Sequence, residues 1–269
     1  MNDLEEYKGR EEMLERVRTA GTISMSPELF EKLYLAPKTN VSGDLRKTIG
    51  NPTPLGLVGF VLGLTPLACC LMGWRGSGGL GAANIGVYFF IGGPLLMISG
   101  LMEFILGNTF PFVVFVTYGG VFFSLGASLQ PFYNAAGAYS PTGSHADGLT
   151  RPEFNASLAF FPVAVACLNI IFMIAATRIN AVFLLVFISA GLGFFLLASG
   201  LWLAAEGEAR ASSLLVGTGA SWFFSAICGW YLLLIQILAI MGFTIKLPVG
   251  DFSGLWNRGK EKRDGDLES

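Results

Sequence analysis

Six long apolar segments limit the possible folds of this chain more than any other feature of its sequence. They are Leu55–Gly73, Asn84–Leu106, Phe112–Tyr133, Ala156–Thr177, Ala181–Leu203 and Leu214–Ile240. Each is close to the ~20 residues that an α-helix needs to cross a bilayer. Only 13% of the residues are charged, about half the share in a typical soluble domain. The sequence therefore predicts an all-α polytopic membrane protein, in which six transmembrane helices surround a narrow central pathway.

The distribution of basic residues predicts which side of the membrane each part of the chain occupies. Six crossings leave both tails, residues 1–50 and 246–269, on the same side of a transmembrane domain at 51–245. These tails and the turn at Arg178 hold 14 of the 17 Lys and Arg residues. Because cytoplasmic segments carry such an excess, we expect both termini to be cytoplasmic and the loop at 134–155 to be external. A short amphipathic helix is conceivable at Leu4–Thr19, but a solvated tail is the preferred interpretation.

The sequence carries no pattern that is typical of catalysis. It has no His/Cys cluster with metal-ligand spacing, no pair of carboxylates within the apolar segments, and no Gly-rich phosphate loop followed by Lys. We therefore expect neither an enzyme nor a cofactor nor a metal site. The basic residues lie mainly in the tails, so the net charge of −2 gives no indication of a nucleic-acid partner.

A polar cluster is predicted where the second segment turns into the third. Glycines recur every seven residues and share one helix face, at Gly86, Gly93, Gly100 and Gly107. Glu103 shares that face, so its carboxyl group should point into protein rather than lipid. We interpret it as a structural carboxylate bonded to nearby side chains or backbone amides, with proton coupling as the alternative. The expected cluster comprises Asn51, Pro52, Pro54, Glu103, Asn108 and Thr109.

Small and uncharged polar residues are predicted near the middle of the membrane. Because an α-helix rises about 1.5 Å per residue, the midplane lies about ten residues from either end of each segment. The candidates near this depth are Thr65, Leu96, Tyr118, Asn169, Ala190 and Gly229. If they face one another, they form a narrow pathway for a small solute, polar enough to hydrogen-bond but without a fixed charge. The alternative is a bundle with ordinary packing glycines and an asparagine that is satisfied internally.

Several short motifs occur in the order and at the spacing found in a known family. They are Asn51-Pro-Thr-Pro-Leu-Gly-Leu57, Gly92-Gly93, Gly100-Leu-Met-Glu103, Gly107-Asn-Thr-Phe110 and Thr117-Tyr-Gly-Gly120. They resemble the acetate uptake transporter family, which includes the bacterial succinate–acetate permease and fungal acetate permeases. The similarity runs from about Asn51 to Pro248, and Lys246–Asp251 resembles the tail segment of fungal members. The resemblance implies six helices, a hexameric assembly and the passage of short monocarboxylates, often thought to be proton-coupled.

The chain departs from the pattern of this family at three places. Leu96 stands where members commonly carry Gln, Val121-Phe122 where they carry Phe-Trp, and Ala190 where a larger apolar residue is frequent. We expect a plasma-membrane transporter of acetate, and also of propionate or lactate, with a small carboxylate, protons, the lipid bilayer and other copies of the chain as partners. Two other functions remain open. One is a non-transporting membrane protein with a signalling or developmental role, and the other is an exporter of ammonia or another small neutral solute.

Overall fold

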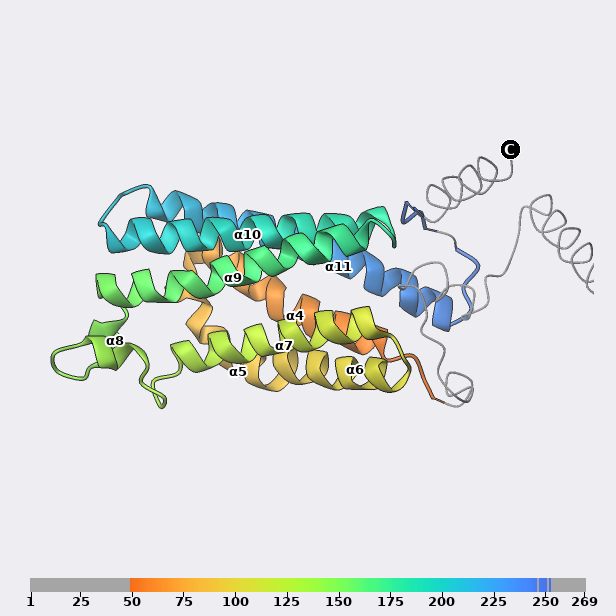
Figure 1. Cartoon of the computed structure of the whole chain (residues 1–269), viewed down its shortest axis with the longest axis horizontal. Coiled ribbons are helices and arrows are strands. Elements are labelled where there is room, and N and C mark those ends of the chain that lie inside the picture. The colour runs from red at the N-terminus through yellow and green to blue at the C-terminus, as the bar shows by residue number, and fades with distance from the viewer. Residues whose placement is uncertain (1–48, 246, 251, 253–269) are drawn as a thin grey trace, which may run out of the picture.

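Six helical spans long and apolar enough to cross a membrane form the bundle in this computed structural model (Figure 1). The structure describes residues 49–245, 247–250 and 252, so Leu4–Thr19 and most of both tails lie outside the described residues. The spans are α4 (Thr53–Leu71), a composite span at Gly79–Ile105, α7 (Thr109–Leu129), α9 (Pro152–Ala176), α10 (Ala181–Ala205) and α11 (Ala211–Ile240). The predicted fold class is confirmed, and the helix ends differ from the predicted ones by a few residues.

The second span is not one regular helix. It consists of η2 (Gly79–Asn84), α5 (Ile85–Val87), η3 (Tyr88–Gly92) and α6 (Gly93–Ile105), of which η3 is a π-helical turn. Gly81 has φ = 77°, and its carbonyl oxygen accepts a hydrogen bond of 3.1 Å from the Tyr88 hydroxyl. A Cβ at Gly81 would lie 2.5 Å from that hydroxyl, so the turn requires glycine. The helical part of this span, Ile85–Ile105, agrees with the predicted segment Asn84–Leu106, whereas the turn at Gly79–Asn84 and the π-helical turn were not anticipated.

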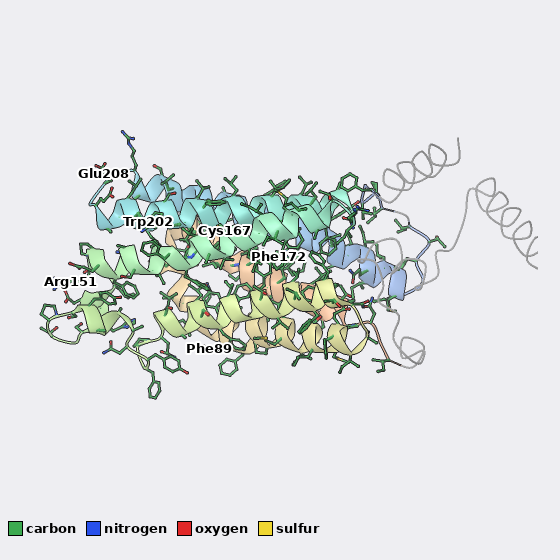
Figure 2. The ribbon with its side chains drawn as sticks, viewed as in Figure 1. Phe89, Arg151, Cys167, Phe172, Trp202 and Glu208 are labelled. Atoms are coloured by element: carbon green, nitrogen blue, oxygen red, sulfur yellow. The ribbon has the colours of Figure 1, made fainter. Side chains whose placement is uncertain are left out.

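The spans form an open ring in which α4 lies between the layer of α6 and α7 and the layer of α9, α10 and α11 (Figure 1). Neighbouring helices pack in the order α9, α10, α11, α4, α6 and α7. Side chains join α7 and α9, the two ends of this ring. The ring centroids of Phe110 on α7 and Phe172 on α9 lie 5.9 Å apart. Figure 2 shows Phe172 between the two layers. We call the end of the bundle near Thr53 the tail end and the end near α8 (His145–Gly148) the loop end.

A compact unit between α7 and α9 covers part of the loop end. It contains η4 (Ala136–Tyr139) and α8. The two pack so closely that a Cβ at Gly148 would collide with the Ala136 carbonyl oxygen. Arg151 forms an ion pair of 2.8 Å with Asp147. The Ser140 hydroxyl and the Arg151 guanidinium together hold the pKa of the Asp147 carboxyl below its usual value.

At the tail end, the chain that follows α11 returns to the bundle and caps α10. We call residues 247–250 the C-terminal strap. The Ala181 and Val182 amides donate to the carbonyl oxygens of Gly250 and Val249 at 2.8 and 3.3 Å. The Asn180 side chain accepts from the Phe183 amide at 2.9 Å. The first N–H groups of a helix lack partners within the helix, so the strap and Asn180 together satisfy the start of α10.

Candidate functional site

Two cavities lie inside the bundle, one toward each end. The wider one, toward the loop end, has a volume of about 90 Å³, and the narrower one, toward the tail end, about 30 Å³. The wider cavity therefore has room for more than a single water molecule. Phe60 and Tyr118 line both cavities, and their rings lie 6.2 Å apart, edge to face. These two side chains form a constriction between the cavities.

The walls of both cavities are apolar. The described residues that line the wider cavity are mainly Leu and Phe, and its three hydroxyl-bearing residues, Tyr118, Ser124 and Ser128, expose almost no polar surface to it. In the narrower cavity, Tyr118 is the only polar side chain among the described lining residues. No charged residue belongs to the described lining of either cavity. Among the residues that the structure describes, no three His, Cys, Asp or Glu side chains lie together as a metal site would need.

The side chain of Asn169 forms a hydrogen bond with the hydroxyl group of Tyr118. The Tyr118 hydroxyl donates to Asn169 Oδ1 at 2.6 Å, and Asn169 Nδ2 donates to the Val165 carbonyl oxygen at 2.9 Å. Asn169 is buried and lines neither cavity, so it supports Tyr118 from α9 without lining the pathway itself. A Cβ at Gly191 would lie 3.1 Å from the Cβ of Asn169, so α10 packs closely behind this amide.

Three further pathway candidates line a cavity. Leu96 and Gly229 line the narrower cavity, and Ala190 lines the wider one. Gly229 also makes room for the constriction, because a Cβ there would lie 2.7 Å from Cε1 of Phe60. The Ala190 carbonyl oxygen accepts a hydrogen bond of 3.2 Å from Trp222 Nε1.

Thr65 lies away from both cavities, unlike the expectation from its depth. Its hydroxyl donates to the Val61 carbonyl oxygen at 2.6 Å and accepts from Trp230 Nε1 at 3.1 Å. Trp230 is 43% exposed, so this pair lies toward the outside of the bundle. The physical reason is that a threonine in a helix can satisfy its hydroxyl on the carbonyl oxygen four residues earlier. Depth alone therefore does not determine the direction of this side chain.

Glu103 joins three chain segments at the tail end. It is fully buried, and its two carboxyl oxygens accept hydrogen bonds from the Thr53 hydroxyl and, at 2.5 Å, from Asn108 Nδ2. The backbone N–H of Asn108 also donates to the backbone carbonyl oxygen of Glu103 at 2.8 Å. Thr109 is exposed and begins α7. Glu103 thus connects the start of α4 to the turn between α6 and α7, and it lines neither cavity.

The segment that leads into α4 is held by two further hydrogen bonds. Asn51 Oδ1 accepts from the Thr53 amide at 3.0 Å, and the Pro52 carbonyl oxygen accepts from the Ser99 hydroxyl at 2.8 Å. Pro54 lies in the first turn of the helix, where its missing N–H costs no hydrogen bond. The hydroxyls of Thr53 and Ser99 were not anticipated from the sequence. Thr53 lies within the first motif, but short hydroxyl residues near a helix start have many alternative partners.

Comparison with known proteins assigns the chain to a family. A family model described as the GPR1/FUN34/yaaH family matches residues 35–253. "Protein alcS" of Aspergillus fumigatus is 44% identical over 239 residues, covering 88% of each chain. "Acetate transporter protein patA" of Penicillium expansum is 29% identical over 219 residues, covering 80% of this chain and 83% of the relative. The solved bacterial acetate channel SatP shares the fold, with a TM-score of 0.60 at 24% identity over 75% of this chain and 99% of that one. The chain belongs to the GPR1/FUN34/yaaH family.

Proposed function

We propose that this protein moves short-chain monocarboxylic acids of the acetate class across a membrane. The observation that carries the proposal is the pair of cavities that meet at Phe60 and Tyr118 inside the six-helix bundle. A relative named an acetate transporter protein supports it. We propose passage rather than catalysis, because the described cavity walls offer almost entirely apolar surface, and their lining residues include no acid–base pair.

The finer features of this function are also proposals. We propose that passage is proton-coupled or channel-like, that propionate and lactate are accepted besides acetate, and that the protein assembles as a homo-oligomer, a hexamer by family resemblance. We further propose that it lies in the plasma membrane with the tail end toward the cytoplasm, on the basis of the asymmetry of Lys and Arg. In this orientation the wider cavity faces outward and Glu103 lies near the inner mouth.

Export of ammonia is a second candidate, because an uncharged apolar pathway suits any small neutral solute. The volume of the wider cavity, about 90 Å³, favours the acid, since a solute of a single heavy atom needs less room. A signalling or developmental role without transport is the third reading. Such a role does not account for the two cavities that share Phe60 and Tyr118.

Uptake by the purified chain in liposomes tests the proposal. Labelled acetate and labelled methylammonium, a substitute for ammonium, are offered in parallel, with and without a pH gradient, and uptake by protein-free vesicles is subtracted. We expect acetate uptake that depends on the protein and that decreases in Phe60→Trp, which enlarges the ring at the constriction. Acetate uptake no faster than in protein-free vesicles would reject the acid transporter. Uptake of methylammonium alone would favour the second candidate.

A further inference from the structure

The wider cavity extends to the outer surface of the bundle between α7 and α9, the two ends of the open ring. Its described lining includes Ser124 and Ser128 on α7 and Leu158 and Phe161 on α9. Ser124 is exposed and Phe161 is 43% exposed, whereas Ser128 and Leu158 are half-buried. Residues that line a cavity and also face outward form the rim of an opening. We call these four residues the lateral rim.

The opening is confined to the part of α7 and α9 nearer the loop end. At the constriction, the Tyr118 hydroxyl is bonded to Asn169, and the centroids of the Tyr118 and Phe172 rings lie 6.4 Å apart, so side chains close the space between the two helices. Beyond this point, α7 carries small residues on its outer face. A Cβ at Gly120, one turn before Ser124, would meet no atom within 4 Å. The lateral rim therefore continues into open space outside the bundle.

The lateral rim lies at the depth of the lipid chains. α7 ends at Leu129, five residues after Ser124, and α9 starts at Pro152, nine residues before Phe161. At 1.5 Å per residue, the two rim residues lie about 7 and 13 Å from the loop end of their helices. The hydrocarbon core of a bilayer is about 30 Å thick, which is close to the length of α7. The opening is thus continuous with the lipid-facing surface.

The chemistry and size of the cavity fit hydrocarbon. Its walls are almost entirely apolar. Apolar space that borders hydrocarbon is filled by hydrocarbon, because close contacts gain dispersion energy that a void forfeits. An engineered apolar cavity of about 150 Å³ holds a benzene molecule, so by proportion about 90 Å³ accommodates about three or four carbon atoms of a chain. A helix of a second copy, about 10 Å across, can cover the rim but cannot enter such a cavity.

We propose that the wider cavity binds the end of a lipid acyl chain, which enters from the bilayer through the lateral rim. The chain end lies against Trp222, which lines the cavity from α11 and is only 4% exposed. Its indole is fixed by a hydrogen bond of 3.2 Å from Nε1 to the Ala190 carbonyl oxygen. This binding site does not depend on which solute the protein transports, so its test requires no transport assay.

Quenching of tryptophan fluorescence by brominated lipid tests the site. Bromine quenches an indole only at close contact. The full chain is reconstituted in phosphatidylcholine that is unlabelled or brominated near the end of one acyl chain. One variant keeps only Trp222 and another keeps only Trp230, which is 43% exposed; the remaining tryptophans are replaced by Phe in each.

We expect brominated chains to quench Trp222 to an extent comparable to Trp230, although Trp222 is buried. Quenching of Trp230 with unchanged fluorescence of Trp222 would overturn the inference. If the variant with Trp222 alone folds poorly, the unmodified chain is compared with Trp222→Phe. The quenched part of the fluorescence should then decrease when Trp222 is removed, and an unchanged quenched part would equally overturn the inference.

A substitution at the lateral rim tests the route of entry. Ser124→Phe fills the opening, so it should reduce quenching of Trp222 and leave quenching of Trp230 unchanged. The matched control is Ser199→Phe, at an exposed serine of α10 that lines neither cavity, and it should change neither. Full quenching of Trp222 in Ser124→Phe would show that no chain enters at the rim. Disulfide-linked dimers of Ser124→Cys, together with an unquenched Trp222, would identify a second copy as the cover and reject the acyl chain.

Discussion

Replacing Glu103 by Leu or by Gln should separate a structural carboxylate from a proton carrier. Glu103 is fully buried and accepts hydrogen bonds from the Thr53 hydroxyl and the Asn108 amide. Leu fills a similar volume but accepts neither bond. Gln can accept from Asn108 through its carbonyl oxygen and donate to the Thr53 hydroxyl through its amide, because a hydroxyl can also accept. The two variants thus differ mainly in whether the polar partners remain satisfied.

The expected loss of stability follows from these bonds. A buried polar group left without a partner costs about 1–3 kcal/mol. Glu103→Leu should lose this amount at the buried Thr53 hydroxyl and a smaller amount at the half-buried Asn108 side chain. Since a domain is stable by only about 5–15 kcal/mol, this loss is severe. Glu103→Gln loses only the charge assistance of the two bonds, which is worth about 1 kcal/mol. In a chain of this size, 1 kcal/mol corresponds to a change in Tm of about 2–4 °C.

Thermal unfolding in detergent and acetate uptake in vesicles should be measured on the same preparations. We expect a large decrease in Tm for Glu103→Leu, a small one for Glu103→Gln, and an unchanged pH dependence of uptake in Glu103→Gln. A Gln variant as stable as the parent whose uptake no longer depends on pH would show that Glu103 carries protons. A Leu variant that unfolds at the parental temperature would refute the reasoning from unsatisfied partners.

Three other predictions use other parts of the bundle. Ala190→Leu adds three carbon atoms to the wall of the wider cavity, so uptake of propionate and lactate should fall before that of acetate; an equal loss for all acids would identify Ala190 as a packing residue. Gly250→Val should destabilise the C-terminal strap and lower the Tm, because Gly250 has φ = 68° and a Cβ there would lie 2.7 Å from the Cβ of Ala181; an unchanged Tm would show that the strap adds no stability. An impermeant thiol reagent should label Ser144→Cys, but not Met241→Cys, from outside intact cells, and the reverse pattern would reject the orientation.

The fold was predictable because apolar length is a strong signal in a membrane protein. Six segments near the required length leave few alternatives, and the part of the chain that the structure describes has six such spans. The same signal did not reveal the short turn at Gly79–Asn84 that precedes the second predicted segment, because its positive φ angles are not visible in composition. Helix ends depend on such local geometry more than on hydropathy.

The candidate site was less predictable, because depth gives a position along the helix axis but no direction around it. Tyr118 and Asn169 share a depth and also meet, whereas Thr65 shares it and turns away. Phe60 was missed entirely, since in an apolar segment a phenylalanine that faces lipid and one that closes a pathway look the same. The direction of the bond between Tyr118 and Asn169 required coordinates, because it depends on a third atom, the Val165 carbonyl oxygen.

Glycines behind the aromatic rings determine the shape of the pathway. A Cβ at Gly229 would lie 2.7 Å from the Phe60 ring, and a Cβ at Gly63 would lie 2.6 Å from the Phe122 ring. Both rings line the wider cavity. Each ring therefore lies where it does because the facing helix has no side chain at that point. Small residues in membrane helices are usually explained by close approach of two backbones. Here the space left by glycine is filled by a ring of the pathway wall, so a methyl group added at either glycine would push that ring toward the cavity. The width available to a solute thus depends on residues behind the rings as well as on the rings themselves.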